Sequence, residues 1–345
     1  MVSQVLRMLR DQLEPQIAAY FARHAITARF YYAFFNSRFT REQLTVLKGR
    51  SLYSSGVRIT SNPALRRNIH RLEKGLLMRP RASTFAADYI EQTVSTFENA
   101  LQVPSSDPVE LAWARDVLEE YFSVVGSGAV IDKSRLKFGS LVAPRETPPE
   151  KVPRPRRESV FADVPYDAFL ALCHQRRSVR WFDGRPVPRK LIEDAVAAAA
   201  QAPSACNRQP YCFRIVENSR EAARLARISM GTSGYAEQIP SLIIVLGDFS
   251  SFSHERDRHL PYIDGALAAM QLMLALETLG LASCPINWPD VEPLERRMEN
   301  ALGLPRHIRP IMLIAVGYAD PDGGVAHSAK KSVTQLTRYT NDYTF

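Results

Sequence analysis

Three arginines and one serine stand close together in the segment HQRRSVRWFD, residues 174–183. These four side chains are Arg176, Arg177, Ser178 and Arg180. Together they would suit a phosphate monoester, because guanidinium groups make two-point contacts with phosphate oxygens and a serine hydroxyl adds another donor. The alternative is a set of basic residues that only complements the dipole at the C-terminal end of a helix, with His174 as a helix-end histidine. The segment therefore predicts a phosphate site or a charged helix end.

A second polar stretch, APSACNRQPY (residues 202–211), follows about twenty residues later. Pro203 and Pro210 bound it, and side chains that can both donate and accept hydrogen bonds lie between them: Ser204, Asn207 and Gln209. Such a loop favours a flat heterocycle with polar edges. The alternative is an ordinary connecting loop, since the same residue types form turns.

Histidines and cysteines give no sign of a metal site. His254 and His259 are five positions apart with no cysteine nearby, which is not a metal-ligand spacing. The chain has four cysteines, Cys173, Cys206, Cys212 and Cys284, without a C-x-x-C pair. Residues 1–15 do not read as a signal peptide, so we expect free thiols and a cytoplasmic protein. Cys206 lies in the polar loop, where we expect a small buried hydrophobic residue in preference to a reactive thiol.

Net charge is unevenly distributed along the chain. The formal excess of +8 falls entirely within residues 1–100. This asymmetry could indicate an acidic partner, but the sequence has no dense Lys/Arg run, and we expect a solvated basic face and no nucleic-acid partner. The aromatic stretch YYAFFNSRF (residues 31–39) is compatible with a peripheral membrane contact or with a buried helix. The apolar run at residues 241–249 is too short to cross a bilayer.

Periodicity divides the chain into three parts. Residues 1–143 have apolar residues at three- and four-residue spacing, as in segments 16–35 and 108–125, and predict a helical N-terminal extension. Residues 144–160 are rich in proline and predict a linker. Residues 161–345 alternate between helical and strand patterns, which predicts helices packed on a sheet. Helices are expected at 164–177, 188–202, 219–230 with Ser219 as N-cap, 263–280 and 292–303, strands at 212–218, 241–249, 281–288 and 309–320, and a polar arm from Gly323 to Phe345.

The expected helix at residues 263–280 is apolar nearly all round. A helix of this kind must be buried on more than one face. A single sheet domain of about 180 residues can hardly bury such a helix alone, so we expect it to lie at a dimer interface. The polar segment 249–261 before it is expected to form a lid near the mouth of the site.

Taken together, these segments resemble the FMN-dependent nitroreductase family. The resemblance covers roughly the C-terminal half of the chain and rests on the order and spacing of RRSVRWF, the run from Val187 to Pro210 that ends in APS…N-x-QP, DGALAAMQLMLALETLGLASCPI, and IMLIAVGYAD. It implies an α+β fold with a central, mostly antiparallel sheet flanked by helices. It also implies an intertwined homodimer with FMN at each subunit interface.

The resemblance also assigns roles to individual residues. Arg176, Arg177, Ser178 and Arg180 would hold the FMN phosphate and ribityl chain. The residues that would reach the flavin from the partner subunit are Pro203, Ser204, Ala205, Asn207 and Gln209. Pro285, Ile286 and Asn287 would lie along the ring, with a backbone N–H of Asn287 or Trp288 near flavin N5, and Lys330 and Lys331 would help to neutralise the phosphate.

This sequence departs from the family pattern at several positions. Asn287 and Trp288 stand where an acidic residue and a glycine are common, so a bulky ring is expected beside the flavin. Ser332 replaces an arginine after the late lysines, and Tyr211 replaces a tryptophan after Gln-Pro. These departures concern access and substrate preference more than phosphate binding.

Three functions are compatible with the sequence. The first is an FMN-dependent oxidoreductase that transfers hydride from NADH or NADPH, through flavin N5, to a small nitro, quinone or enone acceptor, because the flavin carries the redox chemistry and no side-chain nucleophile is needed. The second is a specialised biosynthetic flavoenzyme, since HRLEKGL (residues 70–76) resembles extensions on proteins related to surface-polysaccharide synthesis. The third is a non-catalytic flavin-binding adaptor.

Overall fold

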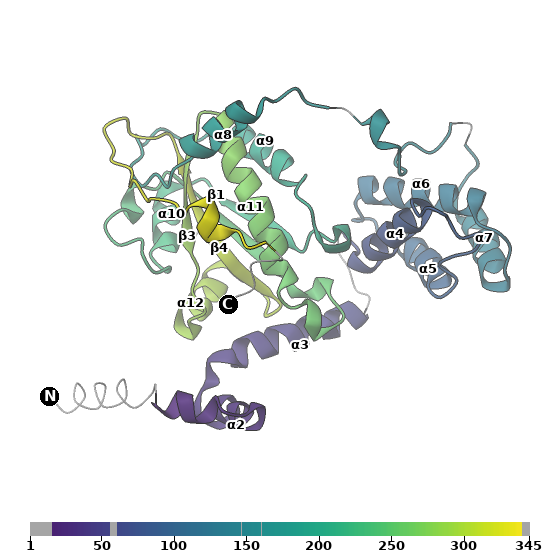
Figure 1. The fold of residues 1–345 in the computed structure, drawn as a ribbon, viewed down its shortest axis with the longest axis horizontal. Helices are drawn as coiled ribbons and strands as arrows, with labels where there is room; N and C mark the ends of the chain where they lie inside the picture. The colour runs from purple at the N-terminus through teal and green to yellow at the C-terminus, as the bar shows by residue number, and fades with distance from the viewer. Residues whose placement is uncertain (1–15, 56–60, 146, 160, 340–345) are drawn as a thin grey trace.

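The computed structural model describes residues 16–55, 61–145, 147–159 and 161–339. Residues 1–15 of the expected extension, and the last six residues of the expected arm, lie outside the described part. A bundle of the helices α4–α7, which lie between Pro63 and Leu141, stands at one side of a larger body that contains the sheet, and helix α3 Thr40–Ser55 runs along this body toward the bundle (Figure 1).

Four antiparallel strands form the sheet in the order β1-β2-β4-β3, so β1 and β3 are its edges. Their bounds are β1 Tyr211–Val216, β2 Ser241–Asp248, β3 Ala282–Asn287 and β4 Ile308–Gly317. Each strand overlaps the segment expected from the sequence and differs from it by at most three residues at either end. Strand β2 is buried along almost its whole length because it lies between β1 and β4 and has helices on both faces.

Side chains of the central strands alternate between two cores, as the two-residue period of a strand requires. Leu242 and Ile244 point into one core, which also contains Leu225 of α10 and Met298 of α12. Ile243 and Val245 point into the other, which contains buried residues of α9 and α11. The helices of this body are α8 Tyr166–Gln175, α9 Arg189–Ala199, α10 Ser219–Ala226, α11 Leu260–Thr278 and α12 Glu292–Leu302. The architecture is therefore α+β, as the sequence predicts.

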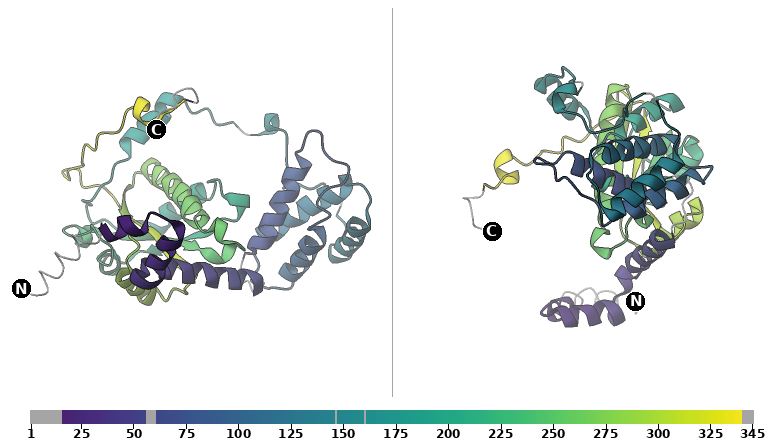
Figure 2. Two further views of the ribbon diagram at one scale, coloured as in Figure 1. Left: turned by 60° about the horizontal axis from the view of Figure 1, so that its bottom comes forward. Right: turned by 90° about the vertical axis from the view of Figure 1, so that its right-hand side faces the viewer.

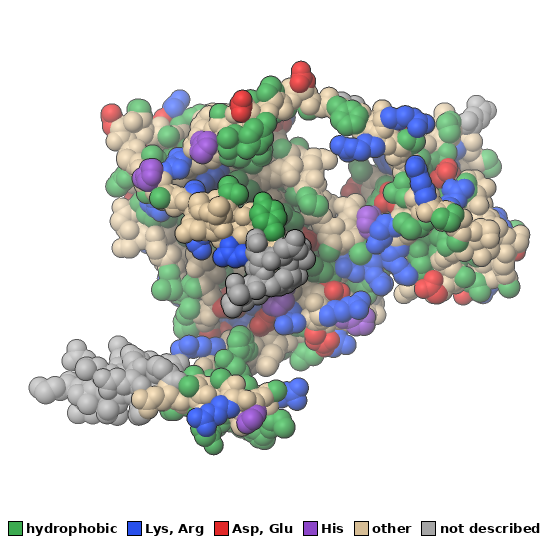
Figure 3. Space-filling model, viewed as in Figure 1, with side chains coloured by type: hydrophobic (Ala, Val, Ile, Leu, Met, Phe, Trp, Pro, Cys, Tyr) green, Lys and Arg blue, Asp and Glu red, His purple; other side chains and the backbone are tan. Residues whose placement is uncertain are grey.

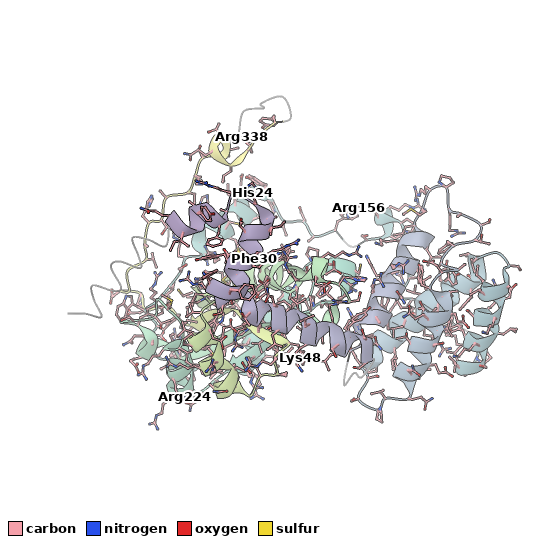
Figure 4. The ribbon with its side chains drawn as sticks, turned by 90° about the horizontal axis from the view of Figure 1, so that it is seen from below. His24, Phe30, Lys48, Arg156, Arg224 and Arg338 are labelled. Carbon is pink, nitrogen blue, oxygen red and sulfur yellow. The ribbon has the colours of Figure 1, made fainter. Side chains whose placement is uncertain are left out.

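The helices α4–α7 bury a core of their own. Leu65, Ile69 and Leu72 of α4 repeat at the spacing of one helix face and are fully buried in it. The bounds are α4 Pro63–Leu76, α5 Ile90–Leu101, α6 Pro108–Val124 and α7 Ala129–Leu141. The chain after α7 is fixed to this bundle because buried Asp116 accepts hydrogen bonds from the backbone N–H groups of Glu150 and Lys151, at 2.9 and 2.8 Å. Arg156, farther along this linker, lies between the bundle and the body (Figure 4).

Two local expectations are corrected by the structure. The helix expected at 16–35 is interrupted near residues 22–24, and then continues as α2 Ala25–Phe30 and a wider turn at Tyr31–Phe35. Asn218, and not Ser219, caps α10, because its side chain accepts the N–H of Glu221 at 3.0 Å.

The segment 249–261, which is expected to form a lid, begins with buried residues. Phe249–Ser251 is a buried turn beneath α3 Thr40–Ser55. Gly49 makes this close approach feasible, since a Cβ atom at that position would lie 2.4 Å from the carbonyl oxygen of Phe249.

The tail after β4 extends away from the body and carries the short helix α13 Val333–Leu336 (Figure 2). Among the residues that the structure describes, no helix combines the length and apolarity needed to span a bilayer. The same described ranges contain no group of three His, Cys, Asp or Glu side chains that could hold a metal ion.

Candidate cofactor site

The arginine segment lies along the outer edge of the sheet. Helix α8 ends at Arg176, where the backbone becomes extended. Ser178 then pairs in parallel with Ser283 of β3, and the N–H of Val179 donates to the carbonyl of Ser283 at 3.0 Å. The backbone pairing thus fixes the arginine and serine side chains against one sheet edge.

Two hydrogen-bonding groups at this edge have no partner within the described part of the chain. Both Arg176 Nε and Ser283 Oγ are buried and make no hydrogen bond there. Arg180 is exposed, and its guanidinium donates a long hydrogen bond, 3.5 Å, to the carbonyl of Ser178. Buried donors are costly when unpaired, so this arrangement suits an anion that accepts from several of them at once.

Neighbouring titratable groups leave the segment positively charged. Burial raises the pKa of Tyr235 to about 12, and its ring lies 5.9 Å from the Arg180 guanidinium carbon. Burial also raises the pKa of the Cys284 thiol, so both groups are neutral near pH 7. Glu277 of α11 is the acidic neighbour of Arg176, and burial raises the pKa of its carboxyl. The charge of Arg176 acts in the opposite direction on the same carboxyl.

Arg177 differs from the other two arginines. Its guanidinium donates to the carbonyls of Ala326, at 2.8 Å, and His327 in the tail. Lys330 and Lys331 lie farther along this tail and are exposed. The structure brings Arg177 to the start of the tail, but no described contact joins either lysine to the arginine segment.

The polar loop has an unusual backbone. Cys206, Asn207 and Gln209 have φ values of 54°, 49° and 49°, in the left-handed region that side chains with a Cβ disfavour. Each such residue costs about 1–2 kcal/mol, and strain of this kind is concentrated at functional sites. Cys206 is only partly buried, so the expectation of a buried hydrophobic residue is wrong.

Asp264 anchors the first half of the loop. Its carboxylate accepts from Ser204 Oγ at 2.7 Å and from the N–H of Ala205 at 3.0 Å. Ser204 Oγ in turn accepts the N–H of Gln209 at 2.7 Å, which closes the loop on itself. The sequence analysis missed Asp264, although a carboxylate in an apolar helix was a usable signal. Pro203, which precedes this turn, is exposed.

Arg66 of α4 braces the second half of the loop. Its guanidinium donates to the carbonyl of Asn207 at 2.7 Å and to Oε1 of Gln209 at 3.0 Å. It also pairs with Glu110 of α6 at 3.1 Å, and the two side chains are only 13% and 4% exposed. Ser61 Oγ and the N–H of Asn62 donate to the same carboxylate, at 2.6 and 2.8 Å. No pattern in the sequence pointed to this contact, because Arg66 and the loop are more than 140 positions apart.

At the end of β3, a ligand would meet the backbone more than the side chains. Ile286 is buried, Pro285 is partly buried and Asn287 is exposed. Trp288 points into the core: it is 8% exposed, and its indole N–H donates to Glu295 at 2.8 Å. The bulky ring expected beside the cofactor is therefore not there, and only the backbone of Trp288 is available at the strand end.

The two halves of the candidate site lie at opposite corners of the sheet. Ser178 pairs with Ser283 of β3, which is opposite Val316 of β4. Tyr211, which follows the loop, is opposite Gly247 of β2, and Gly247 is opposite Arg309 of β4. At about 3.3 Å per residue and 4.8 Å per strand, Tyr211 and Ser283 are about 23 Å apart along the strands and about 14 Å apart across them. Their direct separation is thus about 27 Å.

Comparisons with known proteins identify the family of the C-terminal half. The family model described as "Nitroreductase family" matches residues 173–238 and 228–318. A "Putative NADH dehydrogenase/NAD(P)H nitroreductase" of Methanothermobacter thermautotrophicus is 30% identical over 158 residues, which are 45% of this chain and 79% of that protein. The chain therefore belongs to the nitroreductase family and is an oxidoreductase.

Other relatives carry different names. "Iodotyrosine deiodinase 1" of Mus musculus is 25% identical over 196 residues, 49% of this chain and 68% of that protein. A "NADH dehydrogenase" of Thermus thermophilus is 28% identical over 44% of this chain and 87% of its own length. Among solved structures, a "Putative NADH dehydrogenase/NAD(P)H nitroreductase" from Parabacteroides distasonis is 25% identical with a TM-score of 0.43, covering 50% of this chain and 96% of that one.

Proposed function

We propose that the chain is an FMN-dependent oxidoreductase that takes hydride from NADH or NADPH and passes it to a small organic acceptor of the nitro, quinone or enone type. The observation that carries this proposal is the pair of buried groups Arg176 Nε and Ser283 Oγ, beside Ser178 and Arg180, which have no hydrogen-bond partner among the described residues. A phosphate oxygen is the acceptor that such a set lacks. FMN, when bound, supplies the two-electron chemistry.

The residues of this chain would divide the binding between two ends of the cofactor. Arg176, Ser178 and Arg180 would hold the phosphate, with Lys330 and Lys331 available from the tail. The backbone of Pro285–Asn287 continues along β3 from Ser283 and would support the ring. Arg177 would act indirectly, by tying the tail to the phosphate end.

The loop half of the site would belong to a second copy of the chain. A mononucleotide is shorter than the separation of about 27 Å between the two corners, so one protomer would not close both halves on the same molecule. Helix α11 offers a surface for dimerisation, because Ile263, Leu267 and Met270 repeat along one face and are 52%, 44% and 40% exposed. Pro203, Ser204, Ala205, Asn207 and Gln209 of one protomer would then reach the FMN held by the other.

A titration of apoprotein with FMN tests the phosphate assignment. Charge-assisted hydrogen bonds contribute about 1.5–3 kcal/mol each, so the double variant Arg176→Ala/Arg180→Ala should bind FMN at least about a hundredfold more weakly. Arg220→Ala, which removes an exposed arginine of the same body, is the matched control. Equal affinity of the double variant and the wild type would refute the assignment.

Anaerobic addition of NADH or NADPH to the yellow protein tests the catalytic part. Bleaching of the visible spectrum supports turnover with a nicotinamide, and yellow protein that does not bleach indicates a binding role instead. The relatives' names include both nitroreductases and deiodinases. The acceptor screen should therefore contain a nitroaromatic, a quinone, an enone and a halogenated phenol.

A further inference from the structure

The N-terminal arm, which we define as residues 16–39, is folded but has no core of its own. It lies at the N-terminal end of α3 (Figure 1) and consists of a first helical segment, α2, and the turns Tyr31–Phe35 and Ser37–Phe39. None of its side chains is buried. Aromatic rings of the arm pack against one another, as Phe21 does against Tyr31 and Phe35, with ring centres 5.4 and 5.6 Å apart. The arm therefore holds together locally and leaves many apolar side chains uncovered.

A row of large apolar side chains runs along one side of the arm. Ile26, Phe30 and Phe34 repeat at four-residue spacing and are 65%, 54% and 75% exposed. The other exposed apolar side chains of the arm are Ile17, Tyr20, Tyr32, Phe35 and Phe39. Single apolar residues are common on protein surfaces, whereas a group of this size marks a contact with a protein or a membrane.

The arm is positively charged and contains no carboxylate. Its charged side chains are Arg23, Arg29 and Arg38, with the titratable His24, and the sequence has no Asp or Glu between residues 16 and 39. Arg23 and Arg29 are exposed, and neither forms an ion pair with a described carboxylate. On the face that Figure 3 shows, the arm carries hydrophobic, basic and histidine side chains and no acidic one. Its surface is thus complementary to an anionic partner.

A groove of about 990 Å³ lies between the arm and α3. Its wall contains two carboxylates, Glu42 and Glu255, and both lie outside the arm. Ile26, Phe30 and Phe34 are not part of this wall. The groove therefore neither covers the exposed row nor supplies it with negative charge.

These features favour a lipid surface over a second copy of the chain. Aromatic side chains are enriched at the level of the lipid headgroups, and arginines beside them attract anionic lipids. A second copy offers no matching negative charge, because its residues 101–345 have no net charge and its own arm is equally basic.

We propose that the N-terminal arm binds the surface of an anionic membrane, with Ile26, Phe30 and Phe34 among the lipid chains and Arg23 and Arg29 at the headgroups. The row from Ile26 to Phe34 is about 12 Å long, much shorter than the hydrocarbon core of a bilayer, so the arm lies in the interface and does not cross it. The proposal does not rest on flavin chemistry, since the family model begins at residue 173.

Sedimentation of the full chain with vesicles tests the proposal. We expect binding to vesicles of phosphatidylcholine with one third phosphatidylserine, at least tenfold weaker binding to phosphatidylcholine alone, and weaker binding at high salt. Each arginine contributes about fivefold near an anionic surface, so Arg23→Gln/Arg29→Gln should bind about 25-fold more weakly. Wild type that leaves the anionic vesicles unbound would overturn the proposal.

Phe30→Ser/Phe34→Ser tests the apolar part of the contact. It should bind the anionic vesicles at least tenfold more weakly than wild type. The matched control is Val109→Ser/Leu136→Ser, which removes two apolar side chains of the bundle that are 64% and 78% exposed and should bind as wild type does. Equal binding by wild type and the arm variant would show that another surface meets the lipid, and would overturn the proposal.

Light scattering without lipid separates a membrane from a second copy. Wild type and Phe30→Ser/Phe34→Ser should have the same mass and the same unfolding temperature, because the two rings are exposed. A variant that dissociates into monomers would assign the row to a second copy, and a lower unfolding temperature would assign it to packing within the chain. Either result contradicts the proposal. FMN content, read from the same samples, tests the proposed function separately.

Discussion

The brace between Arg66 and the polar loop permits a quantitative prediction. Replacing Arg66 by Ala removes two hydrogen bonds to the loop and leaves Glu110 buried without its cation. Breaking a buried ion pair costs about 3–5 kcal/mol. Because Ser61 and Asn62 still donate to Glu110, we expect the lower end of this range, about 3 kcal/mol.

The lost stabilisation should affect mainly the polar loop. With three residues in the left-handed region, the loop is strained by about 1 kcal/mol or more at each of them and should relax once the brace is removed. If FMN binding must restore the observed conformation, about 3 kcal/mol corresponds to a dissociation constant that is roughly a hundredfold higher. The dissociation constant is measured from the quenching of flavin fluorescence during titration of the apoprotein at 25 °C.

Two further variants make the experiment specific. Lys74→Ala removes an exposed charge from the same helix and should bind FMN as wild type does. Arg66→Lys keeps the charge but loses the forked geometry, so its affinity should be intermediate. The reasoning is refuted if Arg66→Ala is folded and dimeric, and yet binds FMN within twofold of wild type.

Other predictions concern assembly and stability. Leu267→Glu places a charge on the exposed face of α11 and should convert a dimer into monomers with weakened FMN binding, as light scattering and titration would show; a dimer that persists contradicts the interface. Hydrogen bonding to Arg41 lowers the pKa of Glu292 to about 2, so its stabilisation of the α3–α12 contact should be complete above about pH 4.3 and lost as the pH falls toward 2. Hydrogen exchange in α3 should show that loss in wild type and not in Glu292→Gln. Arg309→Met leaves Glu295 buried and unpaired and should lower the free energy of unfolding by about 3 kcal/mol in urea titrations; a change below about 1 kcal/mol would contradict this.

Local patterns were sufficient for much of the fold. The four strands and the long helix α11 lie close to their expected positions, because a run such as SLIIVLGD is apolar enough to specify a buried central strand by itself. The arginine segment and the loop could also be selected from the sequence, since their residue types are unusual for connecting segments. Short-range choices were less certain: Ser219 and Asn218 are both good caps, and only the observed geometry distinguishes them.

The contacts that complete the site depend on tertiary structure. Arg66 and Glu110 are ordinary charged residues of amphipathic helices, and nothing in their neighbourhood predicts that they meet a loop more than a hundred positions away. The direction of Trp288 was likewise decided by Glu295 and Arg309, which form a buried network that only the packed core creates. The positive φ values of Cys206 and Gln209 have no signal in their residue types, whereas asparagine, as at position 207, adopts such values more readily.

The diagonal placement of the two half-sites has a consequence for mixtures of defective chains. A chain altered at Arg176 and Arg180 keeps a normal loop, and a chain altered at Asp264 keeps a normal arginine corner. If the halves combine across two copies, a heterodimer of these chains contains one wholly intact pocket and one doubly damaged pocket. When the two inactive proteins are unfolded and refolded together, each heterodimer should therefore bind flavin in one of its two pockets. Its flavin content would be up to half that of a wild-type dimer.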